Sequence, residues 1–288
     1  DEFFRSLDLD EEGNVKKDKT EKGLPFEQIF VKWFLLNDPI WSSIVDQFLE
    51  TNKKDLGIDL IFKDKDGNKW AVQSKGYSRT TYITKESIDS FISASPTSKF
   101  YKRLLIASTD RIGANADVTL KENKVVRFLL KDFRNSAIDF PRTIKELSKV
   151  KKIQPFPRRK HQQKAIDDVL RKIKNMDRGQ VLMACGTGKT LTSLWIKEDL
   201  QAKQVLVLVP SLNLLNQTLT AWRSNLSKPF EWQCVCSDKT VHKEKNSEEN
   251  WINDPSELSI PVTSHIQEIK KFLLKREPKV LFSTYQSS

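Results

Sequence analysis

The spacing of apolar residues predicts an α/β chain whose two parts differ in pattern. In the first part, helical spacing over residues 23–36 and 83–95 alternates with short apolar runs at 57–75, 103–108 and 125–130. Short runs of this kind are typical of buried strands, and the turn signal at Asp66-Gly67 splits the first of them into a hairpin. The pattern therefore predicts the order helix, hairpin, helix, strand, helix, strand.

In the second part, predicted strands and helices alternate more regularly. Apolar runs at 180–184, 204–209, 232–237 and 279–285 predict strands, and helical spacing follows the first two of them. This alternation is typical of a parallel sheet that helices cover on both faces. A polar stretch at residues 239–259 interrupts the alternation and predicts a mobile insertion.

A basic segment with three prolines separates the two parts, between Asp139 and His161. The length of 288 residues also suits two domains, each large enough for its own core. We predict a first domain at residues 1–140, a basic linker at 141–160 and a second domain at 161–288.

Composition narrows the class of protein. Hydrophobic residues make up 38% of the chain and charged residues 30%, and no apolar run approaches the roughly 20 residues that a membrane span needs. The N-terminal residues lack the apolar core of a secretory signal. We therefore expect a cytoplasmic protein without a membrane partner.

Three cysteines are too few for a disulfide framework, and their spacing does not give two matching pairs of zinc ligands. Cys234 and Cys236 stand two residues apart, so on a strand they share a face. Core packing is the favoured interpretation, and metal ligation is the alternative.

The net charge of +11 is concentrated in the second half of the chain. Residues 1–150 carry 26 basic and 24 acidic side chains, and residues 151–288 carry 23 and 14. A basic surplus favours a partner rich in phosphate. A solvated basic surface is the simpler alternative.

The most specific motif is the sequence Met-Ala-Cys-Gly-Thr-Gly-Lys-Thr at residues 183–190, between a predicted strand and a predicted helix. In that context, glycines let backbone N–H groups surround phosphate oxygens, and the helix N-terminus adds its dipole. The lysine reaches the β and γ phosphates, and the last hydroxyl binds Mg²⁺. The predicted ATP-binding residues are Gly186, Thr187, Gly188, Lys189 and Thr190, with Thr190 as the Mg²⁺ ligand.

Three flanking segments resemble motifs of superfamily 2 helicases. The Arg-x-His-Gln run that ends at Gln162 is similar to the Q motif, and this likeness implies that Gln162 contacts the adenine base. Residues 209–218 resemble motif Ia, whose loop and helix start hold the DNA backbone. Residues 283–287 resemble the segment before the DEAD or DEAH box.

No acidic box of that kind follows, and the chain ends at Ser288. The pair of acids that holds Mg²⁺ and positions the attacking water is therefore missing, as is a second motor domain with its arginine finger. We expect a fragment of a longer protein, truncated before this box, that does not hydrolyse ATP at a useful rate.

The predicted hairpin carries a second set of candidate residues, Asp59, Gln73 and Lys75. Phosphodiester hydrolysis needs a hard metal ion that polarises the phosphate and activates water, together with a cation against the developing charge. The Asp59 carboxylate, the Gln73 amide oxygen and the Ser74 carbonyl suit Mg²⁺. Lys75 would stabilise the transition state or orient the water. A hairpin with three exposed polar residues is the alternative.

Hairpin register decides between these interpretations. Gln73 and Lys75 share a face of a strand, and Asp59 joins them only if it lies opposite Gln73. That pairing needs a three-residue loop at residues 65–67, with Gly67 in the left-handed conformation. A two-residue turn would pair Asp59 with Ser74 instead. We predict the three-residue loop or an equivalent bulge.

Gly57-Ile-Asp59 and Gln73-x-Lys75, after a helix that bears Phe26-Glu27, resemble the Mrr-like branch of the PD-(D/E)xK nucleases. The resemblance implies a mixed-sheet, restriction-endonuclease-like first domain with catalytic Asp59, Gln73 and Lys75. It also implies that Glu27 lies near the metal, although a solvated helix glutamate is the alternative. The second domain would be RecA-like.

Further segments extend the resemblance over most of residues 20–288. The sequences IDSFISAS, LLIASTD, MACGTGKT, VCSD and TYQSS occur in this order and resemble the N-terminal half of type ISP restriction-modification enzymes. That family joins a nuclease, a two-lobed translocase, a methyltransferase and a target-recognition domain. A phage-defence helicase-nuclease without the methyltransferase is the alternative.

Two functions are consistent with these features. The first is a Mg²⁺-dependent endonuclease coupled to ATP-driven translocation on duplex DNA, which the fragment would contact mainly through the backbone. The second is a DNA-remodelling translocase with an inactive, DNA-binding first domain. A plain RNA helicase does not explain the first half of the chain. Target recognition and methylation would lie in domains that this chain lacks.

Overall fold

The computed structural model describes residues 29–50, 57–141, 146–147, 154–236 and 255–287. The chain divides into two compact units. The first extends to Ile153 and also includes Ser256–Ile260, and the second comprises Gln154–Pro255 and Pro261–Ser288. Within the described ranges, no helix has both the length and the apolar character needed to cross a membrane.

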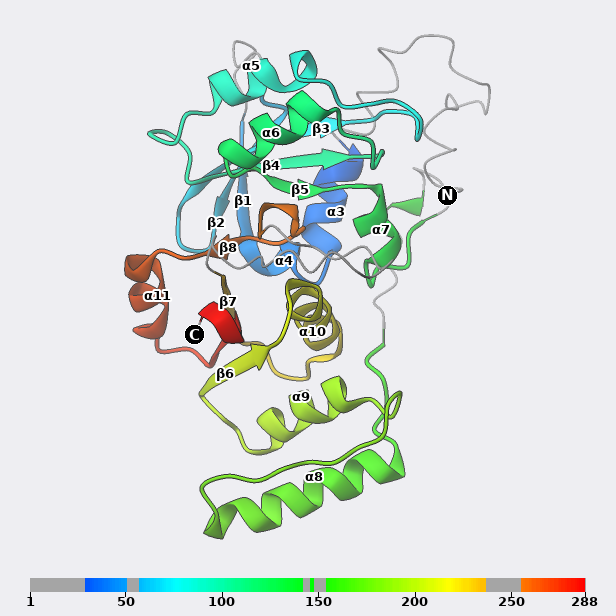
Figure 1. Cartoon of the computed structure of the whole chain (residues 1–288), viewed down its shortest axis with the longest axis vertical. Helices are drawn as coiled ribbons and strands as arrows, with labels where there is room; N and C mark the ends of the chain where they lie inside the picture. Colours follow the sequence, from blue (N-terminus) through cyan, green and yellow to red (C-terminus); the bar gives the residue numbers. More distant parts are fainter. Residues whose placement is uncertain (1–28, 51–56, 142–145, 148–153, 237–254, 288) are drawn as a thin grey trace. The chain divides into compact units, whose positions relative to one another are not determined.

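A five-stranded mixed sheet forms the centre of the first unit (Figure 1). The first three strands pair antiparallel, and the third, fourth and fifth pair parallel. This arrangement agrees with the mixed-sheet domain predicted from the sequence. In spatial order the strands are β1 (Val45–Leu49), β2 (Leu60–Asp64), β3 (Lys69–Lys75), β4 (Lys102–Ala107) and β5 (Val126–Phe128).

Five α-helices accompany this sheet in the described part of the first unit. The predicted order is present, but strand β1 and the short helix before it were missed. The apolar run 125–130 ends in a helix because the Asp132 carboxylate accepts the Leu129 N–H at 2.8 Å and closes the first turn. The helices are α3 (Val31–Asn37), α4 (Trp41–Ile44), α5 (Glu86–Ala94), α6 (Ala114–Glu122) and α7 (Leu130–Asn135).

The two faces of this sheet have different cores. Alternate side chains of β2 and β3, including Phe62 and Trp70, join an aromatic cluster with α3 and α7. On the other face, Ile61 and Ala71 join a more aliphatic cluster with α5 and α6. The residues that continue this second face toward the end of β3 include the candidate nuclease residues.

Asp64 fixes the turn between β2 and β3. Its buried carboxylate accepts the backbone N–H groups of Asp66 and Asn68, at 3.0 and 2.8 Å, and the indole N–H of Trp70 at 3.0 Å. Gly67 has φ +83°, and its N–H donates to the Asp64 carbonyl. The turn is therefore the predicted three-residue loop with a left-handed glycine.

The segment Ser256–Ile260 belongs to the first unit although its neighbours in sequence belong to the second. Leu258 and Ile260 are buried, and Glu257 forms an ion pair with Lys121 of α6 at 3.0 Å. The prediction of a mobile insertion at 239–259 is therefore wrong for its last residues, because an apolar pair anchors them. Residues 239–254 of that prediction lie outside the described residues.

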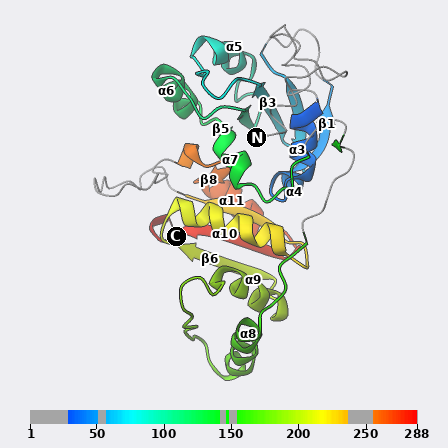
Figure 2. The ribbon, with the colours of Figure 1, turned by 90° about the vertical axis from the view of Figure 1, so that its right-hand side faces the viewer.

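The second unit contains a four-stranded parallel sheet, as its regular alternation predicts. Its spatial order is β6 (Gln204–Val209), β9 (Lys279–Thr284), β7 (Glu231–Val235) and β8 (Val262–Thr263). Figure 2 shows α10 (Leu212–Asn225) running along this sheet, and α8 (Lys160–Lys172) beside α9 (Lys189–Asp199). Helix α11 (Ile266–Leu273) precedes β9.

Two expectations for this unit are not met. Residues 180–184 do not form a strand, and Val181 and Leu182 are 45% and 89% exposed. None of the four described strands pairs with them, and a strand needs a neighbour for its backbone hydrogen bonds. At β6 the described helices do not cover both faces of the sheet, because Leu206 and Leu208 are exposed.

Candidate functional site

The hairpin of β2 and β3 carries the three candidate nuclease residues at one end. The pairs run from Leu60 with Val72 to Lys63 with Lys69, which is the register that the three-residue loop predicts. Asp59 lies just before β2, and its N–H donates to the Val72 carbonyl at 2.9 Å. Gln73 and Lys75 alternate with Ser74 along β3. The predicted register is therefore present within β2 and β3, and the place of Asp59 on the face of Gln73 and Lys75 stays a prediction.

Gly57 allows the chain to enter the hairpin beside helix α5. Its φ of +105° is in the left-handed region, and a Cβ at this position would lie 2.6 Å from the Ser90 carbonyl carbon and 2.7 Å from the Phe91 nitrogen. Both atoms belong to helix backbone, which cannot move aside cheaply. A glycine is thus required two residues before Asp59.

Asp59 is held at the end of the hairpin by the neighbouring strand. One carboxylate oxygen, Oδ2, accepts the Ser74 N–H at 2.6 Å and the Ser74 hydroxyl at 3.1 Å. Burial raises the pKa of Asp59, and the Ser74 N–H and the charge of Lys75 oppose that rise.

Gln73 provides a test of whether a metal ion fits this site. Its side chain is only 3% exposed, and its Oε1 has no hydrogen-bond partner among the described residues. An unsatisfied buried acceptor costs about 1–3 kcal/mol, so a ligand that takes up this oxygen is expected. An amide oxygen beside a carboxylate suits Mg²⁺.

The Ser74 carbonyl faces the same edge of β3 as Asp59. The Ser74 N–H reaches the Asp59 carboxylate, and the N–H and C=O of one strand residue point to the same side. In the described ranges, no group of three His, Cys, Asp or Glu side chains could hold a metal ion. The candidate set therefore relies on one carboxylate, one amide oxygen and one carbonyl. Glu27, the other predicted acid, lies outside the described residues.

The phosphate loop of the second unit has the glycine conformations that such a loop requires. Gly186 and Gly188 have φ values of +76° and +85°, and Gly188 is the N-cap of α9. The Thr187 hydroxyl donates to the Ala184 carbonyl at 2.7 Å. Lys189 Nζ lies 3.2 Å from the Met183 carbonyl and 3.4 Å from that of Ala184, so its ammonium group lies across the loop.

Gln162 lies against this loop. Its Oε1 accepts the Arg159 N–H at 2.8 Å, and its Nε2 donates to the Thr187 carbonyl at 3.0 Å. The side chain is 4% exposed, and a Cβ on Gly188 would lie 2.4 Å from its Nε2. In this arrangement the amide engages the protein at both ends, and adenine contact by Gln162 stays a prediction.

Neighbouring helices hold the phosphate loop and its helix. The Trp222 indole of α10 donates to the carbonyl of Thr190 at 2.9 Å. Arg158 forms two hydrogen bonds with the Asp199 carboxylate at the end of α9, at 2.7 and 2.8 Å. Ser211, in the segment similar to motif Ia, caps α10 through its side chain.

Sequence reasoning missed Ser108 and Thr109, which follow β4 beside the candidate nuclease residues. The Ser108 N–H donates to the Lys75 carbonyl at 3.0 Å. The Thr109 hydroxyl lies 3.0 Å from the Thr81 carbonyl, in the loop after β3. Their position after an apolar strand gave a weak signal, because hydroxyl residues are common at such places. Cys234 and Cys236 are buried, as core packing predicts.

Two family models match the chain, one for each part. Residues 38–151 match a restriction endonuclease family of the Mrr catalytic type, and residues 156–288 match the type III restriction enzyme, res subunit. No protein with a curated description matches the chain. The chain therefore carries a restriction endonuclease domain followed by a helicase-type domain.

Among solved structures, the ATP-dependent type ISP restriction-modification enzyme LlaBIII bound to DNA is similar over 99% of this chain, with 29% sequence identity and a TM-score of 0.77. A second solved structure is a nuclease-deletion mutant of the type ISP enzyme LlaGI in complex with a DNA substrate mimic. The match covers 46% of this chain and 13% of the LlaGI chain, with 34% sequence identity and a TM-score of 0.37. The resemblance to type ISP enzymes is confirmed by the first structure, of which this chain spans 18%.

Proposed function

We propose that the chain is the nuclease and first motor part of an ATP-dependent restriction endonuclease. Its reaction is the Mg²⁺-dependent hydrolysis of DNA phosphodiesters, coupled to ATP-driven translocation on duplex DNA. The observation that supports this proposal is the end of the hairpin, where Ser74 holds the Asp59 carboxylate and the neighbouring buried Gln73 Oε1 has no partner among the described residues.

Each residue of the hairpin has a distinct task in this reaction. Asp59, Gln73 and the Ser74 carbonyl would hold Mg²⁺, which would polarise the phosphate and activate a water. Lys75 stands at the end of β3, where its ammonium group stabilises negative charge that develops on the phosphate oxygens. Ser74 keeps the Asp59 carboxylate in place through its N–H and hydroxyl. Glu27 is proposed to lie near the metal.

The phosphate loop supplies nucleotide binding. Backbone N–H groups around Gly186, Thr187 and Gly188 would surround the phosphates of ATP, and Lys189 would exchange its two loop carbonyls for phosphate oxygens. Thr190 would hold the Mg²⁺ that accompanies ATP, and Gln162 would read the adenine.

The proposed domain limits are residues 1–140 for the nuclease, 141–160 for the linker and 161–288 for the first motor domain. The change from one compact unit to the other falls between Ile153 and Gln154, within the proposed linker. A cytoplasmic location, duplex DNA as the main partner, and further motor, methyltransferase and target-recognition domains are part of the same proposal.

The alternative function, a translocase with an inactive first domain, has less support. It gives no reason for a buried amide oxygen without a partner beside a carboxylate and a lysine. The relative that matches nearly the whole chain is described as an ATP-dependent restriction-modification enzyme bound to DNA, which also favours the catalytic proposal.

Cleavage and ATPase assays on the intact enzyme test the division of labour. Lys75→Ala should lower Mg²⁺-dependent cleavage of a long duplex at least about 100-fold, because it removes the cation at the developing charge, and should leave ATPase activity unchanged. Lys189→Ala should abolish both activities. Lys69→Ala is the matched control, since Lys69 is exposed at the other end of β3. Normal cutting by Lys75→Ala, or loss of its ATPase activity, would overturn the proposal.

A further inference from the structure

Strand β3 ends at Lys75 and leads into a loop that is rich in hydrogen-bond donors. Residues 76–82, here called the donor loop, read Gly-Tyr-Ser-Arg-Thr-Thr-Tyr, and no Asp or Glu occurs between residues 75 and 84. Because β3 and β4 are parallel, with Lys75 opposite Ala107, the donor loop and residues 108–113 leave the sheet at the same edge. This edge is the one that Lys75 occupies.

Two buried hydroxyl groups hold the donor loop. The Ser108 hydroxyl donates to the Tyr77 carbonyl at 2.6 Å, and the Thr109 hydroxyl lies 3.0 Å from the Thr81 carbonyl and 3.3 Å from that of Arg79. Thr109 is fully buried. Burying a hydroxyl is costly unless it is hydrogen-bonded, and here it is bonded to the loop backbone. The loop is therefore fixed at alternate residues.

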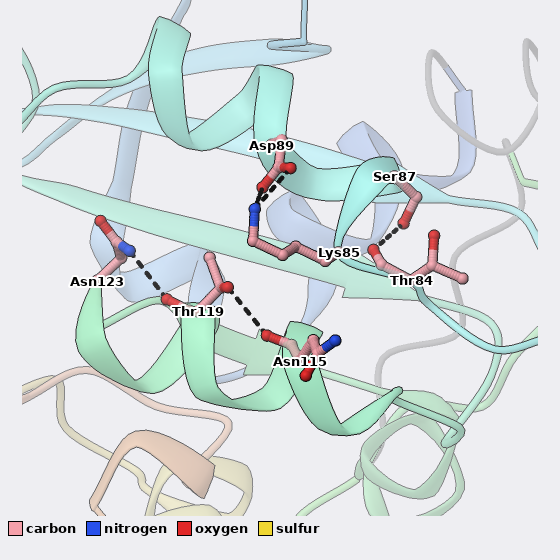
Figure 3. A network of polar contacts seen from close by, with 7 residues as sticks. All are labelled: Thr84, Lys85, Ser87, Asp89, Asn115, Thr119 and Asn123. Carbon is pink, nitrogen blue, oxygen red and sulfur yellow. Dashed lines mark hydrogen bonds and ion pairs between the residues drawn. The ribbon is translucent and has the colours of Figure 1, made fainter.

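The C-terminal end of the donor loop is also fixed. The Ile83 N–H donates to the Arg111 carbonyl at 2.8 Å, and the Ile83 carbonyl accepts the Gly113 N–H at 2.9 Å. Directly afterwards α5 begins, with the Ser87 hydroxyl on the Thr84 carbonyl at 2.7 Å (Figure 3). The loop is thus held in one conformation before any ligand arrives.

The exposed tip of the donor loop, residues 78–82, presents hydroxyl groups and a guanidinium group. The Ser78 and Thr81 hydroxyls are 2.7 Å apart, and the Tyr82 ring is exposed with the Arg111 guanidinium 5.4 Å from its centre. Hydroxyl and guanidinium donors of this kind bind the phosphates and sugars of nucleic-acid backbones.

The first carboxylates after the loop are already engaged. Figure 3 shows the ion pair of Asp89 with Lys85 at 2.8 Å. Asp110, on the neighbouring segment, accepts the Lys131 N–H at 2.7 Å. The ammonium group of Lys85 offsets the charge of Asp89, and the donor loop itself contains no acidic residue, which favours an anionic partner.

We infer that the donor loop, together with Arg111, is a binding surface for the phosphate backbone of DNA. It holds the strand beside Lys75, so that the phosphate to be cut meets the Asp59 face. The inference rests on the proposed function for the identity of the substrate. It assigns to Arg79 and Arg111 contacts with backbone phosphates, and to Thr109 the positioning of the loop.

Binding of a duplex oligonucleotide by the 288-residue chain, measured in EDTA so that no cutting occurs, tests this surface. Arg79→Ala and Arg111→Ala should each weaken binding roughly tenfold and reduce the slope of log K against log salt by about 1, whatever the DNA sequence. Lys99→Ala is the matched control, because Lys99 is exposed in the turn before β4, at the opposite end of that strand. If all three variants give the same slope, the inference is wrong.

A second pair of variants tests the positioning role of Thr109. Thr109→Val removes the hydroxyl at nearly constant volume and should weaken DNA binding without changing the salt slope, since no charge is lost. Thr109→Ser keeps the hydroxyl and should restore wild-type binding. Wild-type DNA binding by a folded Thr109→Val variant would contradict the positioning role. Because Arg79 is exposed, Arg79→Ala should not disturb folding, and it tests phosphate binding independently of Thr109. Because no cleavage is measured, a failure here is distinct from a failure of the Lys75→Ala cleavage test.

Discussion

The hairpin of the first unit and the phosphate loop of the second unit are both short motifs that the sequence predicts, but they differ in how they are supported. The hairpin is part of a five-stranded sheet, and its turn, its register and its entry beside α5 are each fixed by named contacts. The residues before the phosphate loop pair with none of the strands that the structure describes, and Leu182 is almost fully exposed.

This difference shows that a short motif can determine its own backbone conformation without determining which other elements pack against it. Gly186 and Gly188 adopt left-handed conformations without a paired strand before them. In the hairpin, by contrast, the position of Asp59 depends on Asp64, Ser74 and the backbone of α5. Substitutions in the first unit should therefore have larger effects than matched substitutions around the phosphate loop.

Replacing a left-handed glycine in each motif should give the largest contrast. Gly57→Ala adds strain from the positive φ and a contact of 2.6 Å with helix backbone, so it should lower the unfolding free energy of the first unit by about 3 kcal/mol. Gly186→Ala adds only the strain, because nothing lies within 4 Å, and should cost about 1 kcal/mol. Urea unfolding of both variants measures the difference.

Equal losses for the two glycine variants would show that the close approach of Gly57 to α5 is not a constraint. Circular dichroism before unfolding should show that both variants keep their native secondary structure.

A smaller contrast is expected between two leucines. Leu258→Ala removes a fully buried side chain of the segment Ser256–Ile260 and should cost roughly 2–3 kcal/mol. Leu182→Ala removes a side chain that is 89% exposed and should change the unfolding free energy by less than about 0.5 kcal/mol. Thermal unfolding of the two variants checks this, and an unchanged stability of Leu258→Ala would contradict the anchoring of this segment in the first unit.

The smallest effect concerns pH. Burial raises the pKa of Asp132 to about 6. Its protonated carboxyl therefore contributes in full to the unfolding free energy below pH 3.8, and this contribution is lost as pH rises through about 6. The unfolding free energy should therefore fall by roughly 1 kcal/mol between pH 5 and 8. Asp132→Asn keeps an acceptor for the Leu129 N–H and should remove this fall. A variant that retains the full pH dependence would exclude Asp132 as its cause.

Asp199 of the second unit should behave in the opposite way. The hydrogen bonds from Arg158 lower the pKa of Asp199, so its contribution to stability is present above pH 3.8 and is lost as pH falls through the lower folded value. Asp199→Asn should weaken the dependence of stability on acid pH. An unchanged acid dependence would show that the Arg158 contact is too exposed to matter.

Much of the fold was predictable because apolar spacing reports which face of an element is buried. Helix α5, with Ile88 and Phe91 buried, and strands β4, β6 and β9 fall where the pattern predicts. Strand β1 was missed because its burial does not alternate clearly. The buried residues 258–260 were missed because the apolar residues there are few and their partners lie far away in sequence.

The register of the hairpin strands was predictable, because alternation along a strand is simple geometry. The support around it was not, since the contact of Gly57 with α5 and the bonds from Ser108 and Thr109 join residues about 30 positions apart. Gln162 shows the same limit. Its motif suggests a base contact, yet only the fold reveals that its amide is bonded to Arg159 and Thr187.

Diffraction from a crystal soaked with Mn²⁺ tests the central claim most directly, because the anomalous signal locates the ion without any assay of activity. We expect an anomalous peak between the Asp59 carboxylate and Gln73 Oε1, because this oxygen has no partner among the described residues. The peak should be absent from crystals of Asp59→Asn. Wild-type crystals in which Mn²⁺ binds elsewhere but not at this pair, or in which Gln73 Oε1 is bonded within the protein, would contradict it.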